Sequence, residues 1–241
     1  MKTRTFLVTG ASQGIGRATA LQLAKEDVQI AITYAGNSDK AATVVEELKA
    51  KGAKAIAVQL NLKDVNSVRT VFPAVEEKLG KVDVLISNAF GQAIFKPLSY
   101  VTETEFDDIQ ASVKGTFFLL QEAANRLADK GSIVVVSSGA TSMPGAAAGL
   151  YAGSKAAIEH FAMSLAKEMG DREINVNIIS PGVTQTEGLV APKEMVEHLI
   201  QQTPFKRLGQ PEDVADAIVL LTSEQGRWIN MQKVGANGGI L

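Results

Sequence analysis

The stretch TFLVTGASQGIG, residues 5–16, indicates the fold class of this chain, because it joins a predicted strand to a predicted helix through a glycine-rich turn. Its first five residues are apolar and rich in β-branched side chains, which is typical of a buried strand. The glycines that follow, Gly10, Gly14 and Gly16, have the spacing G-x-x-x-G-x-G. Glycines let the backbone turn tightly and let an anion approach the positive N-terminal end of a helix. The sequence therefore predicts a nucleotide-binding turn, although three glycines also suit a turn without a ligand.

On the C-terminal side of this turn, strand-like and helix-like segments alternate along the chain. Short apolar runs indicate strands, and amphipathic stretches between them indicate helices. Right-handed crossovers then give one α/β domain over residues 1–241, a doubly wound (Rossmann-type) parallel sheet with helices on both faces. Ligands of such a sheet bind beyond the carboxyl ends of its strands. The expected strands are residues 5–9, 28–33, 54–60, 82–87, 132–137 and 174–180, and the expected helices are 14–25, 38–51, 65–79, 103–128 and 151–170.

Composition limits the classes of function. The 241 residues carry a formal net charge of −2 without a block of like charges, which argues against a nucleic-acid or anionic-membrane surface. The chain has no cysteine and only two isolated histidines, so we expect neither disulfides nor a metal site. It has no signal-peptide pattern and no run of about 18 apolar residues. We therefore expect a cytoplasmic protein that acts on a small molecule and binds neither nucleic acid nor membrane.

A candidate catalytic pair lies in LYAGSKAAIEH, residues 150–160, where Tyr151 and Lys155 are four positions apart. On a helix the two side chains share a face, so one interpretation is simple packing. The other is chemical, because an ammonium near a phenol lowers the phenol pKa from about 10 and suits Tyr151 to exchange a proton with a substrate oxygen. Ser138 follows a predicted strand at the ligand-binding edge, where its hydroxyl suits a carbonyl oxygen, although serine is also a common turn residue.

Five motifs together resemble the short-chain dehydrogenase/reductase family over nearly the whole chain. They are the glycine turn, SNA at residues 87–89, Ser138, the Tyr151 and Lys155 pair, and SPGVTQT at residues 180–186. Residues 204–241 are also similar to the C-terminal part of the 3-oxoacyl-acyl-carrier-protein reductase-like branch. The resemblance implies an NAD(P)(H)-dependent oxidoreductase that reduces a ketone or aldehyde, or oxidises the corresponding alcohol, by hydride transfer.

The resemblance also implies a role for each matching residue. Tyr151 would be the acid/base, Lys155 would lower its pKa and bind the nicotinamide ribose, and Ser138 would orient the substrate carbonyl. Residues 187–203, with the helical stretch KEMVEHLIQQ, would form a lid over the substrate. The expected cofactor-binding residues are Gly10, Ser12, Gln13, Gly14, Ile15, Gly16, Tyr34, Asn37, Ser38, Asn61, Asn88, Ala89, Tyr151, Lys155, Pro181, Gly182, Val183, Thr184 and Thr186.

Several positions depart from the family pattern. Phe90 stands where the family has a glycine and adds a ring to the cofactor wall, Asn61 replaces an aspartate that faces the adenine, and Met231 replaces a small residue. Ser112 replaces the asparagine of the family's proton-relay tetrad, whose main-chain carbonyl holds a water linking Lys155 to solvent. Because a carbonyl is present whatever the side chain, Ser112 is counted among the expected catalytic residues.

The end of the second predicted strand bears on cofactor choice. NAD-dependent enzymes of this fold usually have an acid there to bind the ribose 2′-hydroxyl. This chain has Thr33 and Tyr34 at that place, followed by Asn37, Ser38 and Lys40, which suit a 2′-phosphate but also suit an ordinary polar turn. We therefore predict that NADP(H) is favoured over NAD(H).

Helices 103–128 and 151–170 carry apolar residues on more than one face, which indicates subunit packing, and the resemblance points to a homotetramer. Three functions remain open: a reductase of small carbonyl compounds, a 3-oxoacyl-acyl-carrier-protein reductase of fatty-acid synthesis, and a nucleotide-binding scaffold without turnover. The second would need a basic docking patch, for which Lys193, Lys206 and Arg207 are the candidates. The intact set of catalytic side chains argues against the third.

Overall fold

A seven-stranded parallel sheet forms the centre of the molecule in the computed structural model, which describes residues 3–189 and 193–241. Its strand order is β3-β2-β1-β4-β5-β6-β7, so the chain reverses direction across the sheet between β1 and β4. An open α/β sheet binds its ligands beyond the carboxyl ends of the strands at such a reversal. The strands are β1 (Arg4–Val8), β2 (Val28–Tyr34), β3 (Lys54–Gln59), β4 (Val84–Ser87), β5 (Ser132–Val136), β6 (Asn175–Pro181) and β7 (Lys233–Ala236).

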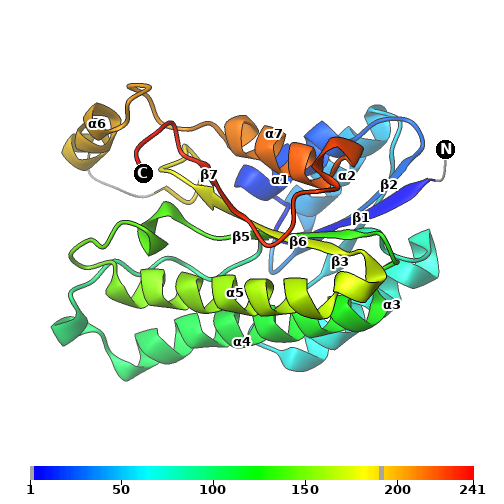
Figure 1. Ribbon diagram of the computed structural model, residues 1–241, viewed down its shortest axis with the longest axis horizontal. Helices are drawn as coiled ribbons and strands as arrows, with labels where there is room; N and C mark the ends of the chain where they lie inside the picture. The colour runs from blue at the N-terminus through cyan, green and yellow to red at the C-terminus, as the bar shows by residue number, and fades with distance from the viewer. Residues whose placement is uncertain (1–2, 190–192) are drawn as a thin grey trace.

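Helices cover both faces of the sheet (Figure 1). One face carries α1 (Gly14–Leu23), α2 (Ser38–Ala50) and α7 (Pro211–Thr222), and the other carries α3 (Val65–Leu79), α4 (Glu103–Arg126) and α5 (Gly149–Glu168). Each face has its own apolar core, and neighbouring residues of β1 divide between them: Leu7 packs into the core under α3, α4 and α5, and Val8 into the other. Alternation of this kind follows from the two-residue period of a strand.

The doubly wound parallel sheet predicted from the sequence is confirmed, with most boundaries within two residues. Among the described residues, one strand and one α-helix, β7 and α7, lie outside the predicted set. β7 has only four residues, Lys-Val-Gly-Ala, and lacks the β-branched run that marks the other strands. α7 does have a start signal, because Pro211 occupies its first turn and Gln210 and Asp213 form a reciprocal cap.

Within the described residues, no helix has the length and apolar character needed to span a membrane. The same part of the chain has no group of three or more histidine, cysteine, aspartate or glutamate side chains arranged to hold a metal ion.

Candidate active site

The turn between β1 and α1 is built from glycines and backbone groups. Gly10 and Gly14 have positive φ angles of 64° and 57°, a region that glycine adopts without strain. A Cβ atom added to Gly16 would lie 2.6 Å from the side-chain nitrogen of Asn88 and 2.6 Å from the Gly10 carbonyl oxygen, so the turn tolerates no side chain there. The Gly14 N–H donates to the carboxylate of Glu187 (3.1 Å). The Glu187 carboxylate therefore lies at the positive end of α1, where the pyrophosphate of a cofactor would bind.

The loop after β4 fixes this turn from the neighbouring strand. The side-chain amide of Asn88 donates to the carbonyls of Thr9 (2.9 Å) and Gly10 (3.1 Å). The Thr9 hydroxyl in turn accepts from the N–H groups of Asn88 and Ala89, both at 3.0 Å. Thr9 is a structural residue that the sequence analysis did not single out. Its only signal was a hydroxyl side chain at the junction between strand and glycine turn.

A cation from α2 reaches the outer side of the glycine turn. The Lys40 ammonium donates to the side-chain oxygen of Gln13 (3.2 Å), and Asn37 caps α2 by accepting from the Lys40 N–H (2.9 Å). Thr33 has a structural role, because its hydroxyl accepts from the Gly10 N–H (3.1 Å). No carboxylate stands at the end of β2, and the first acid after it is Asp39.

Other residues expected at the cofactor lie close to these elements. Ser12 and Ile15 are half-buried in the glycine turn, Tyr34 is half-buried at the end of β2, and Ser38 is the exposed first residue of α2. Asn61 follows β3 and accepts from the Lys63 N–H (3.0 Å), so its side chain closes a local turn. The contacts of all five with a cofactor remain predictions.

The segment after β6 runs from the sheet to the glycine turn. Gly182 donates to the carbonyl of Ala236 (3.0 Å), and a Cβ atom on it would lie 2.9 Å from Asn237, so only glycine fits between β6 and β7. Thr184 donates to the Gly182 carbonyl (3.0 Å), and Thr186 lies against Gly14. Residues 181–186 thus link the expected nicotinamide side to the expected pyrophosphate side.

The expected lid, residues 187–203, is described only in part, because residues 190–192 lie outside the described residues. Its helical stretch is confirmed as α6 (Lys193–Gln202), which Figure 1 shows at the edge of the molecule near the C-terminus. Whether α6 covers a substrate remains a prediction.

Ser138, Tyr151 and Lys155 come together at the carboxyl end of β5. Ser138 follows β5, Tyr151 lies in the first turn of α5, and Lys155 follows one turn later. The Tyr151 and Ser138 side chains are hydrogen-bonded to each other, and the buried Lys155 ammonium donates to the Val136 carbonyl (2.9 Å). The structure therefore places two hydroxyls side by side with an amine beside them.

Burial dominates the protonation of this group. It raises the pKa of the Tyr151 phenol above its ordinary value, and the hydrogen bond with Ser138 opposes the rise. The net direction is therefore upward, and the lowering expected from Lys155 remains a prediction. Burial also lowers the pKa of Lys155 to about 7, while the charge of Glu159 opposes that fall. A lysine that is partly neutral at pH 7 exerts less of the field that would stabilise a phenolate.

Two aromatic rings flank the Tyr151 ring. Phe90 meets it edge-on with ring centroids 6.3 Å apart, and Phe95 lies at 5.3 Å. The Phe90 ring also faces the Lys155 ammonium, which is 4.0 Å from its centroid, a favourable cation–π distance. Phe95 is 60% exposed although it is large and apolar. The surface beside the phenol is therefore apolar and aromatic.

Ser112 lies inside α4 and is buried. Its hydroxyl faces Gly91, because a Cβ atom added there would lie 2.7 Å from it. The Ser112 carbonyl, which would hold the relay water, accepts from the Thr116 hydroxyl (2.9 Å). A water at this carbonyl would therefore share the oxygen with Thr116 or displace it, and the catalytic role of Ser112 remains a prediction.

Comparisons with known proteins identify the family of the chain. The family model described as "Enoyl-(Acyl carrier protein) reductase" matches residues 10–241. The 3-oxoacyl-[acyl-carrier-protein] reductase FabG of Staphylococcus aureus (strain Mu50) is 38% identical over 99% of this chain and 98% of its own length.

Two solved structures are similar over nearly their whole length. A short chain dehydrogenase from Burkholderia cenocepacia in complex with NADP has a TM-score of 0.94 at 32% identity and covers 99% of this chain and 98% of its own. The angucycline C-6 ketoreductase LanV with bound NADP has a TM-score of 0.91 at 35% identity and covers 99% and 95%. With these full-length matches and the confirmed fold, the chain belongs to the short-chain dehydrogenase/reductase family of oxidoreductases.

Proposed function

We propose that the protein is an NADPH-dependent reductase of small apolar ketones or aldehydes, with Tyr151 as the proton donor. The observation that carries this proposal is the hydrogen-bonded pair of Ser138 and Tyr151 hydroxyls with Lys155 buried beside it. Two adjacent hydroxyl donors suit one carbonyl oxygen, which accepts through two lone pairs.

The chain's own residues supply the proton and the orientation. Ser138 donates a hydrogen bond to the carbonyl oxygen and so holds the carbonyl carbon in place. Tyr151 donates its proton to the same oxygen as that carbon is reduced, which leaves an alcohol and a phenolate. The Lys155 ammonium stabilises the phenolate. A bound nicotinamide would supply the hydride. Residues of the glycine turn and residues 181–186 would hold that cofactor.

Residues around the glycine turn support NADPH. Lys40 brings a positive charge to Gln13, beside the turn, and the end of β2 lacks the acid that would bind a ribose 2′-hydroxyl. The Burkholderia dehydrogenase and LanV structures both contain NADP, which favours the same choice.

The surface charges favour a free small molecule over an acyl-carrier-protein substrate. Arg207 makes a two-bond ion pair with Asp213 (2.5 and 2.8 Å), which raises the pKa of Arg207 and lowers that of Asp213 to about 2. Lys193 pairs with Glu197 (3.7 Å). Two of the three candidate cations for an acidic carrier are therefore ion-paired within the chain, and the third, Lys206, donates to the Gln201 carbonyl. The rings of Phe90 and Phe95 beside Tyr151 instead favour an apolar or aromatic carbonyl compound.

Reduction of an enoyl double bond is the second candidate, because the matching family model carries that description. Such a reaction would place the hydride on the β-carbon of a conjugated thioester and the proton on the α-carbon, so the final proton acceptor would be a carbon and not the oxygen that the Ser138 and Tyr151 hydroxyls suit. The geometry thus favours the carbonyl reaction.

We also propose a homotetramer that uses the outer faces of α4 and α5. An apolar hollow of about 420 Å³ lies between Leu98, Phe106 and Leu150, and a second of about 510 Å³ lies beside Phe117 and Phe161. Phe106 and Phe117 are both exposed. Apolar surface of this kind marks an interface.

The deciding experiment follows nicotinamide absorbance with purified protein and three substrates: a bicyclic aromatic ketone, an acetoacetyl thioester and a crotonyl thioester. We expect NADPH to be consumed with the ketone fastest and with the crotonyl thioester not at all. Consumption with the crotonyl thioester alone would replace the proposal with enoyl reduction. Binding of NADPH without consumption with any substrate would favour the scaffold. Light scattering on the same sample tests the tetramer, which a monodisperse monomer would contradict.

A further inference from the structure

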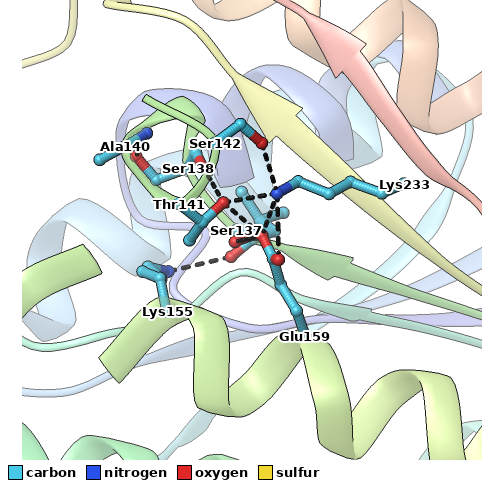
Figure 2. Close-up of polar contacts among 9 residues, drawn as sticks. Ser137, Ser138, Ala140, Thr141, Ser142, Lys155, Glu159 and Lys233 are labelled. Atoms are coloured by element: carbon cyan, nitrogen blue, oxygen red, sulfur yellow. Dashed lines mark hydrogen bonds and ion pairs between the residues drawn. The ribbon is translucent and has the colours of Figure 1, made fainter. Parts of the chain in front are cut away.

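A cluster of polar side chains lies directly behind the catalytic residues and joins three elements of the fold. We call it the Glu159–Lys233 cluster; its members are Ser137, Thr141, Ser142, Glu159 and Lys233 (Figure 2). Glu159 comes from α5, Lys233 from β7, and the three hydroxyls from the loop between β5 and α5. The proposed reaction uses none of these five side chains.

The carboxylate of Glu159 is almost fully buried, with 7% of the residue exposed. The Lys233 ammonium lies 3.0 Å from each of its two oxygens. One oxygen also accepts from the Ser137 hydroxyl (2.5 Å) and lies 2.8 Å from the Thr141 hydroxyl. A buried carboxylate with this many donors is held in one position.

Lys233 binds the catalytic loop as well as the carboxylate. Its ammonium donates to the hydroxyls of Thr141 (2.6 Å) and Ser142 (2.9 Å), so all three of its protons have acceptors. Thr141 then connects to the catalytic serine, because its hydroxyl and its N–H lie 2.8 Å and 3.2 Å from the Ser138 carbonyl oxygen. The Thr141 hydroxyl has one proton, so it donates either to the Ser138 carbonyl or to Glu159 at any one time.

Glu159 also acts on the catalytic lysine through space. It lies one helical turn beyond Lys155 on the same face of α5, and Figure 2 shows both side chains directed toward the end of β5. Among the described residues, the charged or titratable groups recorded in this cluster and around Lys155 are Tyr151, Glu159 and Lys233. The remaining contacts of Lys155 are the Val136 carbonyl and the Phe90 ring, which carry no net charge.

We propose that Glu159 and Lys233 are positioning residues for the reaction: their ion pair fastens the Ser138 loop to α5 and β7 and sets the electrostatic field at Tyr151 and Lys155. This inference rests on the proposed function. It assigns a task to Lys233, which lies 74 positions away from Glu159 in the chain and on the edge strand of the sheet.

The two members of the pair act with opposite sign on the catalytic groups. The Glu159 charge opposes the burial-induced fall in the Lys155 pKa, and a negative charge also favours the protonated phenol of Tyr151. Removing that charge therefore lowers both pKa values. Removing Lys233 leaves the negative charge less compensated and raises both. Reduction needs the phenol and the ammonium protonated, so the loss of activity at high pH reports these two groups as a coupled pair.

The test uses Glu159→Gln and Lys233→Met, which break the same ion pair with little change in side-chain size. Lys49→Met is the matched control, because Lys49 makes an exposed ion pair with Glu46 (2.9 Å) on α2. The double variant Glu159→Gln/Lys233→Met removes both charges together and so leaves no buried unpaired charge, which protects its folding. For each, kcat for the ketone and the NADPH Kd are measured across pH, with circular dichroism to verify folding.

We expect both single variants to lower kcat about tenfold at neutral pH, with the NADPH Kd within about twofold, because only the Ser138 loop is loosened. The alkaline limb of the kcat profile should move to lower pH in Glu159→Gln and to higher pH in Lys233→Met. The double variant should keep the lower kcat, with the alkaline limb of its kcat profile near that of the parent. Lys49→Met should have the kcat and the alkaline limb of the parent.

Two results would overturn the proposal. One is an alkaline limb that moves the same way, or not at all, in both single variants, since a merely structural role predicts no opposite shifts. The other is a double variant with the kcat of the parent. If the single variants fail to fold, the double variant's kcat decides. A parent protein that reduces no carbonyl compound would instead refute the proposed function, and the two failures are thereby distinguished.

Discussion

The two ends of the candidate site are held together by different means. At the β1–α1 turn, the parts that fit together are glycines, main-chain carbonyls and the short side chains of Thr9 and Asn88. At the β5–α5 loop, they are long charged side chains, Glu159 and Lys233, which reach the loop from two other elements. The first end is specified by glycines, backbone groups and two short side chains, and the second by two long charged side chains.

This difference has a consequence for function. A turn made of backbone offers N–H groups at fixed positions, and it binds an anion without a change in the protonation of any side chain. The β5–α5 loop is held by an ion pair beside the proton donor, so the same two charges fix the position of the loop and set the electrostatic field at Tyr151. We therefore expect changes at the first end to alter cofactor affinity, and changes at the second to alter turnover.

The largest expected effect is at the catalytic end. Tyr151→Phe should lower kcat by roughly 10²- to 10⁴-fold, because the ring still packs between Phe90 and Phe95 but has no proton to transfer. The NADPH Kd should stay within about twofold of the parent value. Steady-state kinetics and a fluorescence titration of NADPH provide the two measurements. Equal losses in turnover and in cofactor affinity would erase the proposed separation between the two ends.

A smaller effect is expected at the glycine end, where cofactor affinity should fall more than turnover. In Gly16→Ala the new Cβ atom would lie 2.6 Å from both Asn88 and the Gly10 carbonyl, and the turn must shift. Overpacking of this kind costs about 1–3 kcal/mol, so we expect the NADPH Kd to rise by about 5- to 150-fold, with kcat at saturating cofactor less affected. Gly170→Ala is the control, because an added Cβ atom there meets no atom within 4 Å. An unchanged Kd in Gly16→Ala would contradict the close fit.

The two ends of the site also differ in how far the sequence could predict them. The glycine spacing is local, so residues 10–16 could be assigned to a turn with a defined shape. The strands followed from continuous apolar runs, since a strand covered on both faces has no polar side. Tyr151 and Lys155 could be paired because they are one helical turn apart.

The contacts behind the catalytic residues have no such local pattern. Lys233 lies in a four-residue strand without a β-branched run, and its partner Glu159 reads as a polar residue on a helix. Only the pairing of β6 with β7 brings the two together. The direction of the Tyr151 pKa was also beyond the sequence, because it depends on burial.

The outer side of the glycine end carries a charged side chain, Lys40. Lys40→Met should weaken NADPH binding up to about tenfold and leave the NADH Kd unchanged, because a charge-assisted bond to the 2′-phosphate contributes about 1 kcal/mol at an exposed site. Lys49→Met, near the other end of α2, should change neither. Both Kd values come from titration at one ionic strength. Tighter binding of NADH than NADPH by the parent protein would refute the cofactor prediction.

The smallest effect is expected at Ser112, where a relay through the side chain and a relay through the main-chain carbonyl predict different results. If the side chain at this position supplied the proton relay, Ser112→Asn would restore a missing group and raise kcat. The structure favours a small response, because the relevant group is the main-chain carbonyl, which already accepts from Thr116 (2.9 Å) whatever stands at 112. We therefore expect Ser112→Asn to change kcat by less than about fivefold, roughly 1 kcal/mol in the barrier.

Thr116→Val, which frees the carbonyl to hold a water, should raise turnover more than Ser112→Asn does. The reverse order in steady-state kinetics would assign the relay to the side chain.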